Sequence, residues 1–339
     1  MLNFIIRRLS YGFLVILGVV LIVFLLFHAL PGDPVAMLAG QRTDVATREM
    51  VKKELGLDKP MHVQLGLYMN DLSPLSIHAD NQKNQEKYDY TPLFSIGDNI
   101  LVLKTPYLRR SFQTNRRVGD ILIENIESTF WLAFTAMVFA TIIGISLGMA
   151  AALKQNTTWD YLLVGGSVLG ISVPSFVSGI IIAMIFGYYL SDYTGLNLTG
   201  QLWEIDPIKG RQLHLENLIL PAFTLGIRPL AIIVQLTRSS MLDVLDQDYI
   251  RTAKAKGLSK KRIIIKHALK NALNPVITTV SGWLATLMAG AFFVEYIFDW
   301  KGLGFVTIKA VQNLDFPVVM GSTLLIAIVF VLITIFVDI

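Results

Sequence analysis

Six stretches of the chain are long and apolar enough to cross a bilayer as helices. A bilayer core about 30 Å thick requires about 20 mostly apolar residues in a helix. Five of the six stretches contain no Asp, Glu, Lys or Arg, and the fourth contains only Arg228. The pattern therefore predicts an all-α integral membrane protein with six transmembrane helices, at Leu9–Leu30, Ser128–Leu153, Tyr161–Leu190, Asn217–Thr237, Val276–Val294 and Phe316–Val337.

The first apolar stretch is predicted to remain in the chain as a signal anchor. It follows Arg7 and Arg8 and runs for 22 residues, whereas the apolar region of a signal peptide has about 7–15. The sequence after it, Leu30-Pro-Gly-Asp-Pro34, is not an Ala-x-Ala cleavage site. We therefore expect residues 1–30 to form a cytoplasmic N-terminus and the first transmembrane helix.

The distribution of basic residues predicts the orientation of the helices. With the N-terminus in the cytoplasm, the inner segments 1–8, 154–160 and 238–275 carry 12 Lys and Arg in 53 residues. The short outer segments 191–216 and 298–315 carry 4 in 44 residues. Because short cytoplasmic loops are enriched in Lys and Arg, both termini are expected in the cytoplasm.

The segment between the first two helices predicts a long extracytoplasmic loop or lobe. Segment 31–127 has 12 basic and 13 acidic residues and is too long for its charge to decide the orientation. Residues 44–56 are predicted to be helical, and the polar stretch 71–108 is predicted to be an inserted subdomain or a mobile lobe. The remaining residues, 128–339, are expected to form a five-helix core that includes the cytoplasmic loop 238–275.

The composition excludes several classes of function. Hydrophobic residues make up 53% of the chain and charged residues 16%, with a mean hydropathy of +0.57, against about 25% charged residues in soluble proteins. The chain has no Cys, which excludes thiolate metal sites and thiol nucleophiles. The five His show no metal-binding spacing, and no phosphate-binding loop, H-E-x-x-H or G-x-S-x-G motif is present. We expect no metal, no cofactor, no ATP binding, no enzymatic activity of this chain and no nucleic-acid partner.

The segment 238–275 predicts a helix–turn–helix. A helix from Gln247 to Lys256 is expected to stop at Gly257, and Ser259 is a favourable N-cap for a second helix that reaches about Leu273, before Pro275. The second helix has one apolar stripe among basic residues. Two interpretations remain open: a basic amphipathic helix that rests on anionic lipid headgroups, or an element that docks into a groove of another protein. The small residues Ala253 and Ala255 favour docking.

The same segment resembles the EAA loop of the membrane subunits of ABC importers. Ala253 and Gly257 match its second alanine and its glycine, whereas Arg251 replaces the first acidic residue and Lys270 the inner proline. Much of the remaining chain resembles the B-type permease subunit of the dipeptide, oligopeptide and nickel importers. The matching motifs lie in order along the chain and are Leu30-Pro-Gly-Asp-Pro34, Leu55-Gly-Leu-Asp-Lys-Pro60, Ser111-Phe112, Asn115-Arg-Arg-Val118, Ser172-Val-Pro-Ser-Phe176, Leu220-Pro-Ala-Phe-Thr-Leu-Gly226, Thr237-Arg-Ser-Ser-Met241, Val294-Glu-Tyr-Ile-Phe298 and Gly302-Leu-Gly304.

The resemblance implies half of a permease in the bacterial inner membrane. Its implied partners are a second, homologous permease subunit, two cytoplasmic ATP-binding subunits that hold ATP and Mg²⁺, and an extracytoplasmic substrate-binding protein. Membrane lipids surround it. The implied cargo is a dipeptide or oligopeptide, with nickel or another small solute as the alternative. The residues implied in coupling to the ATPases are Arg251, Thr252, Ala253, Lys254, Ala255, Lys256, Gly257, Leu258 and Ser259.

Three residues in or near the predicted spans are further candidates. Pro174 is expected to bend or break the third helix, either as a structural kink only or as a hinge of a gate. Arg228 lies inside the fourth span, where an Arg costs at least about 2.5 kcal/mol. It is expected to pair with Glu295, to meet a peptide carboxylate on the translocation path, or to snorkel to the interface.

Two other classes of membrane protein fit the sequence less well. A secondary transporter without an ATPase often has inverted repeats and paired broken helices, but residues 1–160 and 161–339 show no convincing repeat. A membrane enzyme would need a cluster of titratable residues at the end of a span, and Arg228 with Glu295 is a weak one. The ATP-driven importer is therefore the favoured hypothesis, with alternating access as its mechanism.

Overall fold

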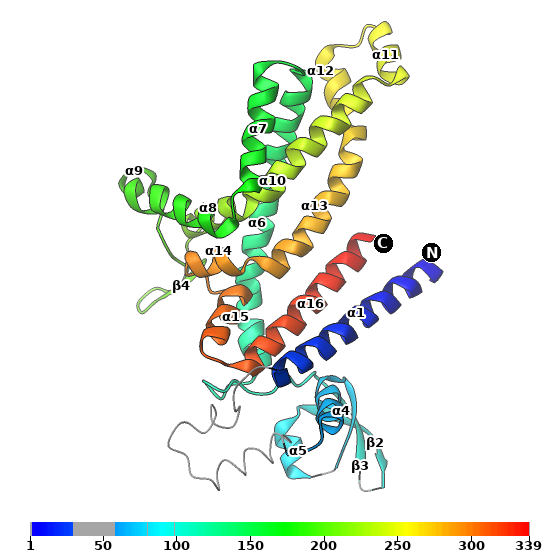
Figure 1. Ribbon diagram of the computed structural model, residues 1–339, viewed down its shortest axis with the longest axis vertical. Helices are drawn as coiled ribbons and strands as arrows, with labels where there is room; N and C mark the ends of the chain where they lie inside the picture. The colour runs from blue at the N-terminus through cyan, green and yellow to red at the C-terminus, as the bar shows by residue number, and fades with distance from the viewer. Residues whose placement is uncertain (1, 30–57, 80, 98, 339) are drawn as a thin grey trace. The chain divides into compact units, whose positions relative to one another are not determined.

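The computed structural model describes residues 2–29, 58–79, 81–97 and 99–338 (Figure 1). The chain forms two compact units. The core unit consists of Met1–Arg8, Asn125–Phe305 and Val329–Ile339, and the lobe unit of Leu9–Glu124 and Val306–Ile328. Four helices contribute residues to both units: α1 (Leu2–Ala29), α6 (Val118–Leu153), α15 (Leu303–Gln312) and α16 (Phe316–Asp338).

The core unit is built mainly of helices around an apolar centre. Buried side chains of α6, α10 and α13 form this centre, among them Leu132, Ile233 and Val276. An antiparallel hairpin of β4 (Trp203–Asp206) and β5 (Gly210–Leu213) interrupts the helices. The helices after α6 are α7 (Thr158–Ser172), α8 (Ser175–Ile182), the π-helix η1 (Ala183–Tyr189), α9 (Ser191–Thr194), α10 (Glu216–Leu245), α11 (Asp248–Ala255), α12 (Lys260–Arg262), the π-helix η2 (Ile263–Leu269), α13 (Lys270–Gly290) and α14 (Phe292–Ile297).

The predicted set of membrane spans is confirmed in outline. In the described part of the chain, five helical stretches are long and apolar enough to cross a membrane: Asn3–Phe27, Val118–Leu153, Glu216–Leu245, Lys260–Ala289 and Phe316–Val337. A sixth span is formed if the broken pair Thr158–Ser172 and Ser175–Tyr189 counts as one, and its two parts are bent by 106°. The break lies at Val173 and Pro174, as the position of the proline predicts.

The predicted end of the second helix in segment 238–275 is wrong. Instead of stopping near Leu273, the helix that begins at Lys260 continues through η2 and α13 as one span to Ala289. Pro275 therefore lies inside α13. A proline removes one backbone hydrogen bond, and a membrane helix can kink and continue past it. Pro275 therefore does not stop the helix, although the sequence pattern predicts that it would.

The lobe unit contains a small sheet that the all-helical prediction did not include. Its strands are β1 (Leu75–Ala79), β2 (Tyr90–Ile96) and β3 (Asn99–Lys104), antiparallel in the order β1-β3-β2. Helices α4 (Met61–Leu72) and α5 (Gln82–Lys87) complete it. The polar stretch 71–108 thus folds as a small α/β subdomain. The helix predicted at 44–56 lies outside the described residues.

Helix α4 packs against the C-terminal part of α1. The rings of Phe24 and Tyr68 stack with their centroids 5.9 Å apart. Phe27 meets Phe316 of α16 edge to face at 5.7 Å. These rings belong to an apolar cluster with Val20, Val23, Met320 and Leu324. The subdomain is therefore attached directly to helices that are apolar enough to span the membrane.

Candidate functional site

Helix α11 is anchored to the core unit by one apolar edge. Ile250 is fully buried and Ala253 nearly so. They pack in one cluster with side chains from the C-terminal end of α6, from α10 and from the helix that begins at Lys260; the buried members are Ala152, Met241, Ile263, Ala268 and Ala272. A displacement of α11 must therefore displace the ends of α6, α10 and α13, because closely packed side chains transmit strain.

The other face of α11 is exposed and basic. Arg251, Lys254 and Lys256 are exposed. Arg251 Nη1 lies 3.3 Å from Asp248 Oδ1, but both side chains are largely in solvent, so this ion pair contributes little. Of the nine residues predicted to couple to a partner, Arg251, Thr252, Lys254, Ala255, Lys256, Gly257 and Ser259 are exposed, Ala253 is buried and Leu258 is half-buried.

Gly257 ends α11 in the left-handed conformation, with a φ of +72°. The Leu258 N–H donates to the Ala253 carbonyl at 3.3 Å, a bond typical of a glycine-terminated helix. A Cβ on Gly257 would have no atom of this chain within 4 Å, so its backbone conformation, and not crowding, requires glycine. Ser259 precedes α12 in extended conformation, but its side chain forms no capping hydrogen bond. Ser259 therefore occupies the predicted N-cap position, but without the hydrogen bond that makes a serine favourable there.

A buried ion pair joins α7 to α10 close to this cluster. Arg238 Nε and Nη2 each lie 2.6 Å from an oxygen of Asp160. The Asp160 side chain is 2% exposed and the Arg238 side chain 27%. The Asn156 N–H also donates to Asp160 at 3.0 Å. In Figure 1 the α6–α7 turn lies at the same end of the core unit as α11 and α12, so the pair fixes the helix ends that carry α11.

The sequence alone does not predict this pair. Arg238 lies in the motif Thr237-Arg-Ser-Ser-Met241, and Asp160 follows a polar turn in which charges are common. The available signal was the presence of opposite charges at the same ends of two predicted spans. Gly148 is part of the arrangement, because a Cβ there would lie 2.5 Å from the Val234 carbonyl oxygen and 3.2 Å from the Arg238 nitrogen. Only a glycine lets α6 approach α10 this closely.

Glu295 is fully buried and holds the loop after α14. Its Oε1 accepts a hydrogen bond from Thr129 Oγ1 at 2.7 Å, and its Oε2 accepts one from the Phe305 N–H at 3.0 Å. The Leu303 N–H donates to the same Thr129 oxygen at 2.8 Å. A Cβ on Gly302 would lie 2.5 Å from Glu295 Oε2. The carboxylate is therefore enclosed by backbone N–H groups and glycines.

The structure does not bring Arg228 and Glu295 together. Arg228 is exposed on α10, and none of the ion pairs found among the described residues joins it to Glu295. The physical reason is that burial raises the pKa of Glu295 to about 7, while a hydroxyl and backbone N–H groups already donate hydrogen bonds to its carboxyl group, so the group does not require a cation. The predicted pairing is thus not formed, and the translocation path and snorkelling remain as roles for Arg228. In the part of the chain that the structure describes, no group of three His, Cys, Asp or Glu side chains could hold a metal ion.

Comparison with known proteins gives consistent matches over the whole chain. Residues 144–339 match the family model "Binding-protein-dependent transport system inner membrane component", and residues 1–133 match the model of its N-terminal part. The dipeptide transport system permease protein DppB of Escherichia coli strain K12 is 37% identical over 356 aligned positions, which cover 100% of this chain and 96% of that protein.

Two further matches show how far the similarity extends. The glutathione transport system permease protein GsiC of Salmonella paratyphi A is 33% identical, with 100% and 96% of the two chains covered. A solved inward-facing structure of the MetNI methionine ABC transporter matches with a TM-score of 0.50 and 15% identity. That match covers 64% of this chain and 93% of the other, and at this identity it supports the fold alone.

Proposed function

The chain belongs to the family of binding-protein-dependent transport system inner membrane components, and on this premise we propose that it is the membrane subunit of an ATP-driven importer of dipeptides or oligopeptides. The assignment of the cargo rests on the similarity of this chain, over its full length, to permeases named for dipeptide and glutathione transport. Family membership rules out the secondary transporter and the membrane enzyme. Hydrolysis of ATP belongs to separate subunits, and this chain provides part of the path.

The exposed face of α11 is proposed to be the surface that docks on an ATPase subunit. Two observations support this. The basic residues Arg251, Lys254 and Lys256 point into solvent at the end of the core unit, and the opposite edge of the same short helix is buried. A helix held in this way can receive a displacement and pass it to α6, α10 and α13. Closure of the ATPase dimer would then switch the spans between a state in which the path opens to the cytoplasm and a state in which it opens to the outside.

We further propose the assembly and its orientation. A second, homologous permease subunit forms the other half of the path, two ATPases bind ATP and Mg²⁺ in the cytoplasm, and a substrate-binding protein delivers cargo outside. Both termini face the cytoplasm, and segment 31–127 lies outside. A cysteine placed at Asn84 of this Cys-free chain should react with a membrane-impermeant maleimide in intact spheroplasts. Labelling only after lysis would reverse the orientation.

Arg228 and Pro174 are proposed to act in the translocation path. Arg228 is exposed on α10 and has no ion-pair partner among the residues described, which suits a cation that meets the free carboxylate of a peptide. Pro174 lies at the 106° break between α7 and α8. Such a break is a natural place for a hinge, because the backbone there lacks the continuous hydrogen bonding of a helix.

The proposed function is tested by purification and transport. The chain should co-purify from its native membrane with ATPase subunits, and the complex in proteoliposomes should take up labelled peptides only when ATP and the binding protein are present. Labelled nickel serves as the second cargo. ATP-driven uptake of nickel without uptake of peptides would overturn the cargo, and uptake by a complex that lacks ATPases would overturn the proposed class.

A further inference from the structure

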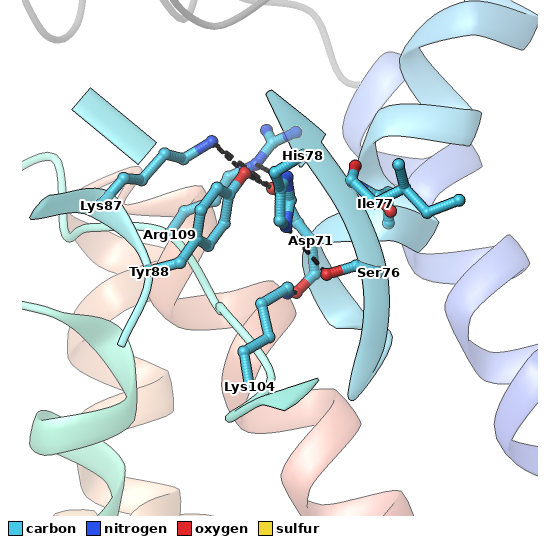
Figure 2. Close-up of polar contacts among 9 residues, drawn as sticks. Asp71, Ser76, Ile77, His78, Lys87, Tyr88, Lys104 and Arg109 are labelled. Carbon is cyan, nitrogen blue, oxygen red and sulfur yellow. Dashed lines mark hydrogen bonds and ion pairs between the residues drawn. The ribbon is translucent and has the colours of Figure 1, made fainter. Parts of the chain in front are cut away.

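The interior of the lobe subdomain is occupied by a polar hub. The hub consists of Asp71, Ser76, His78, Lys87, Tyr88, Lys104 and Arg109, and Figure 2 shows these side chains gathered on one side of β1. The Tyr88 hydroxyl donates to Asp71 Oδ1, and Lys87 Nζ lies 3.4 Å from the same oxygen. Lys104 donates to the Asp71 carbonyl, and Ser76 Oγ lies 2.8 Å from His78 Nε2.

The hub occupies the position where a small sheet usually places apolar side chains. Ser76 is 3% exposed, His78 8%, Lys104 5% and Asp71 6%. Burying such groups is unfavourable unless hydrogen bonds replace the lost water, and here the contacts within the hub do so. The inward positions of β1 are therefore occupied by the polar residues Ser76 and His78, and its apolar residues Leu75 and Ile77 lie on the other face.

The opposite face of the sheet is uncharged and mainly apolar, with Thr91 and Asn99 as its polar members at the edges of the apolar side chains. We call its apolar part the apolar sheet face, which consists of Leu75, Ile77, Phe94, Leu101 and Leu103. The strand register places Leu75 opposite Leu103, and both Ile77 and Phe94 opposite Leu101. The exposed fractions are 56% for Leu75, 53% for Ile77, 67% for Phe94 and 49% for Leu103. In Figure 2, Ile77 points away from the hub. Contiguous exposed apolar side chains of this kind mark a binding surface.

The attachment of the subdomain to α1 identifies what covers this face. Tyr68 of α4 stacks on Phe24 of α1 and shares one apolar cluster with Val20, Val23 and Phe27, and these residues of α1 lie inside a candidate membrane span. The next element is β1, only two residues after α4 ends, and Asn70 Nδ2 of α4 contacts the Ile77 carbonyl at 3.5 Å. The subdomain is thus held at the level where α1 leaves the bilayer.

The chemistry of the face also favours lipid over a protein partner. A soluble partner that binds and leaves in every cycle uses an interface with polar and charged groups, whereas all five residues of the apolar sheet face are uncharged aliphatic or aromatic side chains. The exposed flank of α1 next to α4 has the same character, with Ile22, Leu25 and Leu26 each more than 50% exposed. The two surfaces are equally suited to hydrocarbon.

We propose that the apolar sheet face inserts into the bilayer leaflet at the C-terminal end of α1 and anchors the lobe subdomain to the membrane surface. The polar hub is the internal structure that makes this possible, because the hub and Val102 fill the inward face, and the sheet does not need its outward apolar side chains for packing within the subdomain. The anchor fixes the subdomain on the membrane surface and keeps it from rotating about α4. This inference rests on α1 as a membrane span and does not depend on the cargo or on ATPase docking.

Site-specific fluorescence in nanodiscs tests the anchor. The chain has no native Cys, so Ile77→Cys and Phe94→Cys each give it one labelling site for bimane, and the partner subunits of the complete importer are used as Cys-free variants. The nanodiscs contain phosphatidylethanolamine and phosphatidylglycerol with a doxyl-labelled lipid. We expect doxyl quenching of both sites to be at least threefold greater than at Asp89→Cys, an exposed site in the turn before β2. Leu25→Cys on α1 is the lipid-exposed reference.

Two results would overturn the proposal. Quenching at both Ile77 and Phe94 that equals the value at Asp89 would place the face in water. Weak quenching combined with shielding from an aqueous quencher only after the substrate-binding protein is added would assign the face to that protein. A monodisperse complex and ATP-driven transport by each labelled variant show that the substitution left the fold intact. A failure of the proposed transport function is therefore distinguished from a failure of the proposed anchor.

Discussion

Removal of the Asp160 carboxylate should destabilise the end of the core unit that carries α11. Asp160→Asn keeps the size of the side chain but leaves Arg238 beside a neutral group. Two contacts of 2.6 Å are weakened at once. Loss of one partner of a buried pair costs about 3–5 kcal/mol. Because the Arg238 side chain is still 27% exposed, water can partly replace the carboxylate, and we expect a loss near the lower limit, about 3 kcal/mol.

This loss should appear both in stability and in coupling. For large domains, 1 kcal/mol corresponds to a shift in Tm of about 2–4 °C, so Asp160→Asn should lower the Tm of the purified complex by at least about 6 °C. The ATPase activity stimulated by the loaded binding protein should fall more than the basal activity, because α10, which moves with α11, would no longer carry α7 with it. Size-exclusion chromatography of heated samples and phosphate release provide the two measurements.

A double-mutant cycle separates the pair from other effects of the substitutions. Arg238→Met removes the other partner, and the double variant should be more stable than the sum of the two losses predicts, with a coupling energy of about 1–3 kcal/mol. Arg251→Met is the matched control, because its ion pair with Asp248 is exposed and should contribute under about 1 kcal/mol. Additive losses, or an Asp160→Asn variant with wild-type Tm and coupling, would refute the reasoning.

Four further outcomes are expected. Gly257→Val should reduce stimulated ATPase activity, whereas Gly257→Asn should retain most of it, because Asn tolerates the positive φ at this position; equal activities would contradict a backbone requirement. Gly302→Ala should lower the thermal stability of the complex, since its Cβ would lie 2.5 Å from Glu295 Oε2, and an unchanged Tm would show that the loop can adjust. Burial lowers the pKa of His78, with Lys104 as a second cause, so the unfolded lobe binds more protons and hydrogen-exchange protection of β1 and β3 should decrease as the pH falls below about 6.5; protection that is constant from pH 8 to 5 would contradict this. Arg228→Met should leave the Tm unchanged but reduce uptake of peptides with a free carboxylate relative to amidated peptides, and equal losses for both would exclude a contact with the carboxylate.

The spans and α11 could be predicted from the sequence because each depends on a local property. Long apolar runs give the helices that cross the membrane, and a glycine after a polar helix gives the turn at Gly257. The prediction failed where a residue has two possible effects. The position of Pro275 predicts a helix end near Leu273, but the helix continues through the proline. The strength of a proline as a helix breaker depends on whether neighbouring helices hold the chain in place, and a sequence does not contain that information.

The lobe sheet escaped prediction because its pattern is inverted. Strand β1 alternates as a strand should, with Leu75 and Ile77 on one face and Ser76 and His78 on the other. The usual assumption places the apolar face inside, and with polar neighbours such as Asp71 and Lys87 the stretch then looks like a mobile insertion. In the structure the polar side chains are buried and satisfy one another. Only the positions of their partners reveal this, and those partners come from four different elements.

Glu295 shows the same limit for a single charge. A sequence displays side-chain cations but no backbone N–H groups, so the search for a partner of a buried carboxylate led to Arg228. The actual donors are the Thr129 hydroxyl and the N–H of Phe305. Gly302 and Gly304 were the available signal, because two glycines separated by one residue, shortly after a glutamate, allow the backbone to approach a carboxylate closely. Since Glu295 is satisfied without a cation, Arg228 does not serve as its structural partner and remains available for the solute.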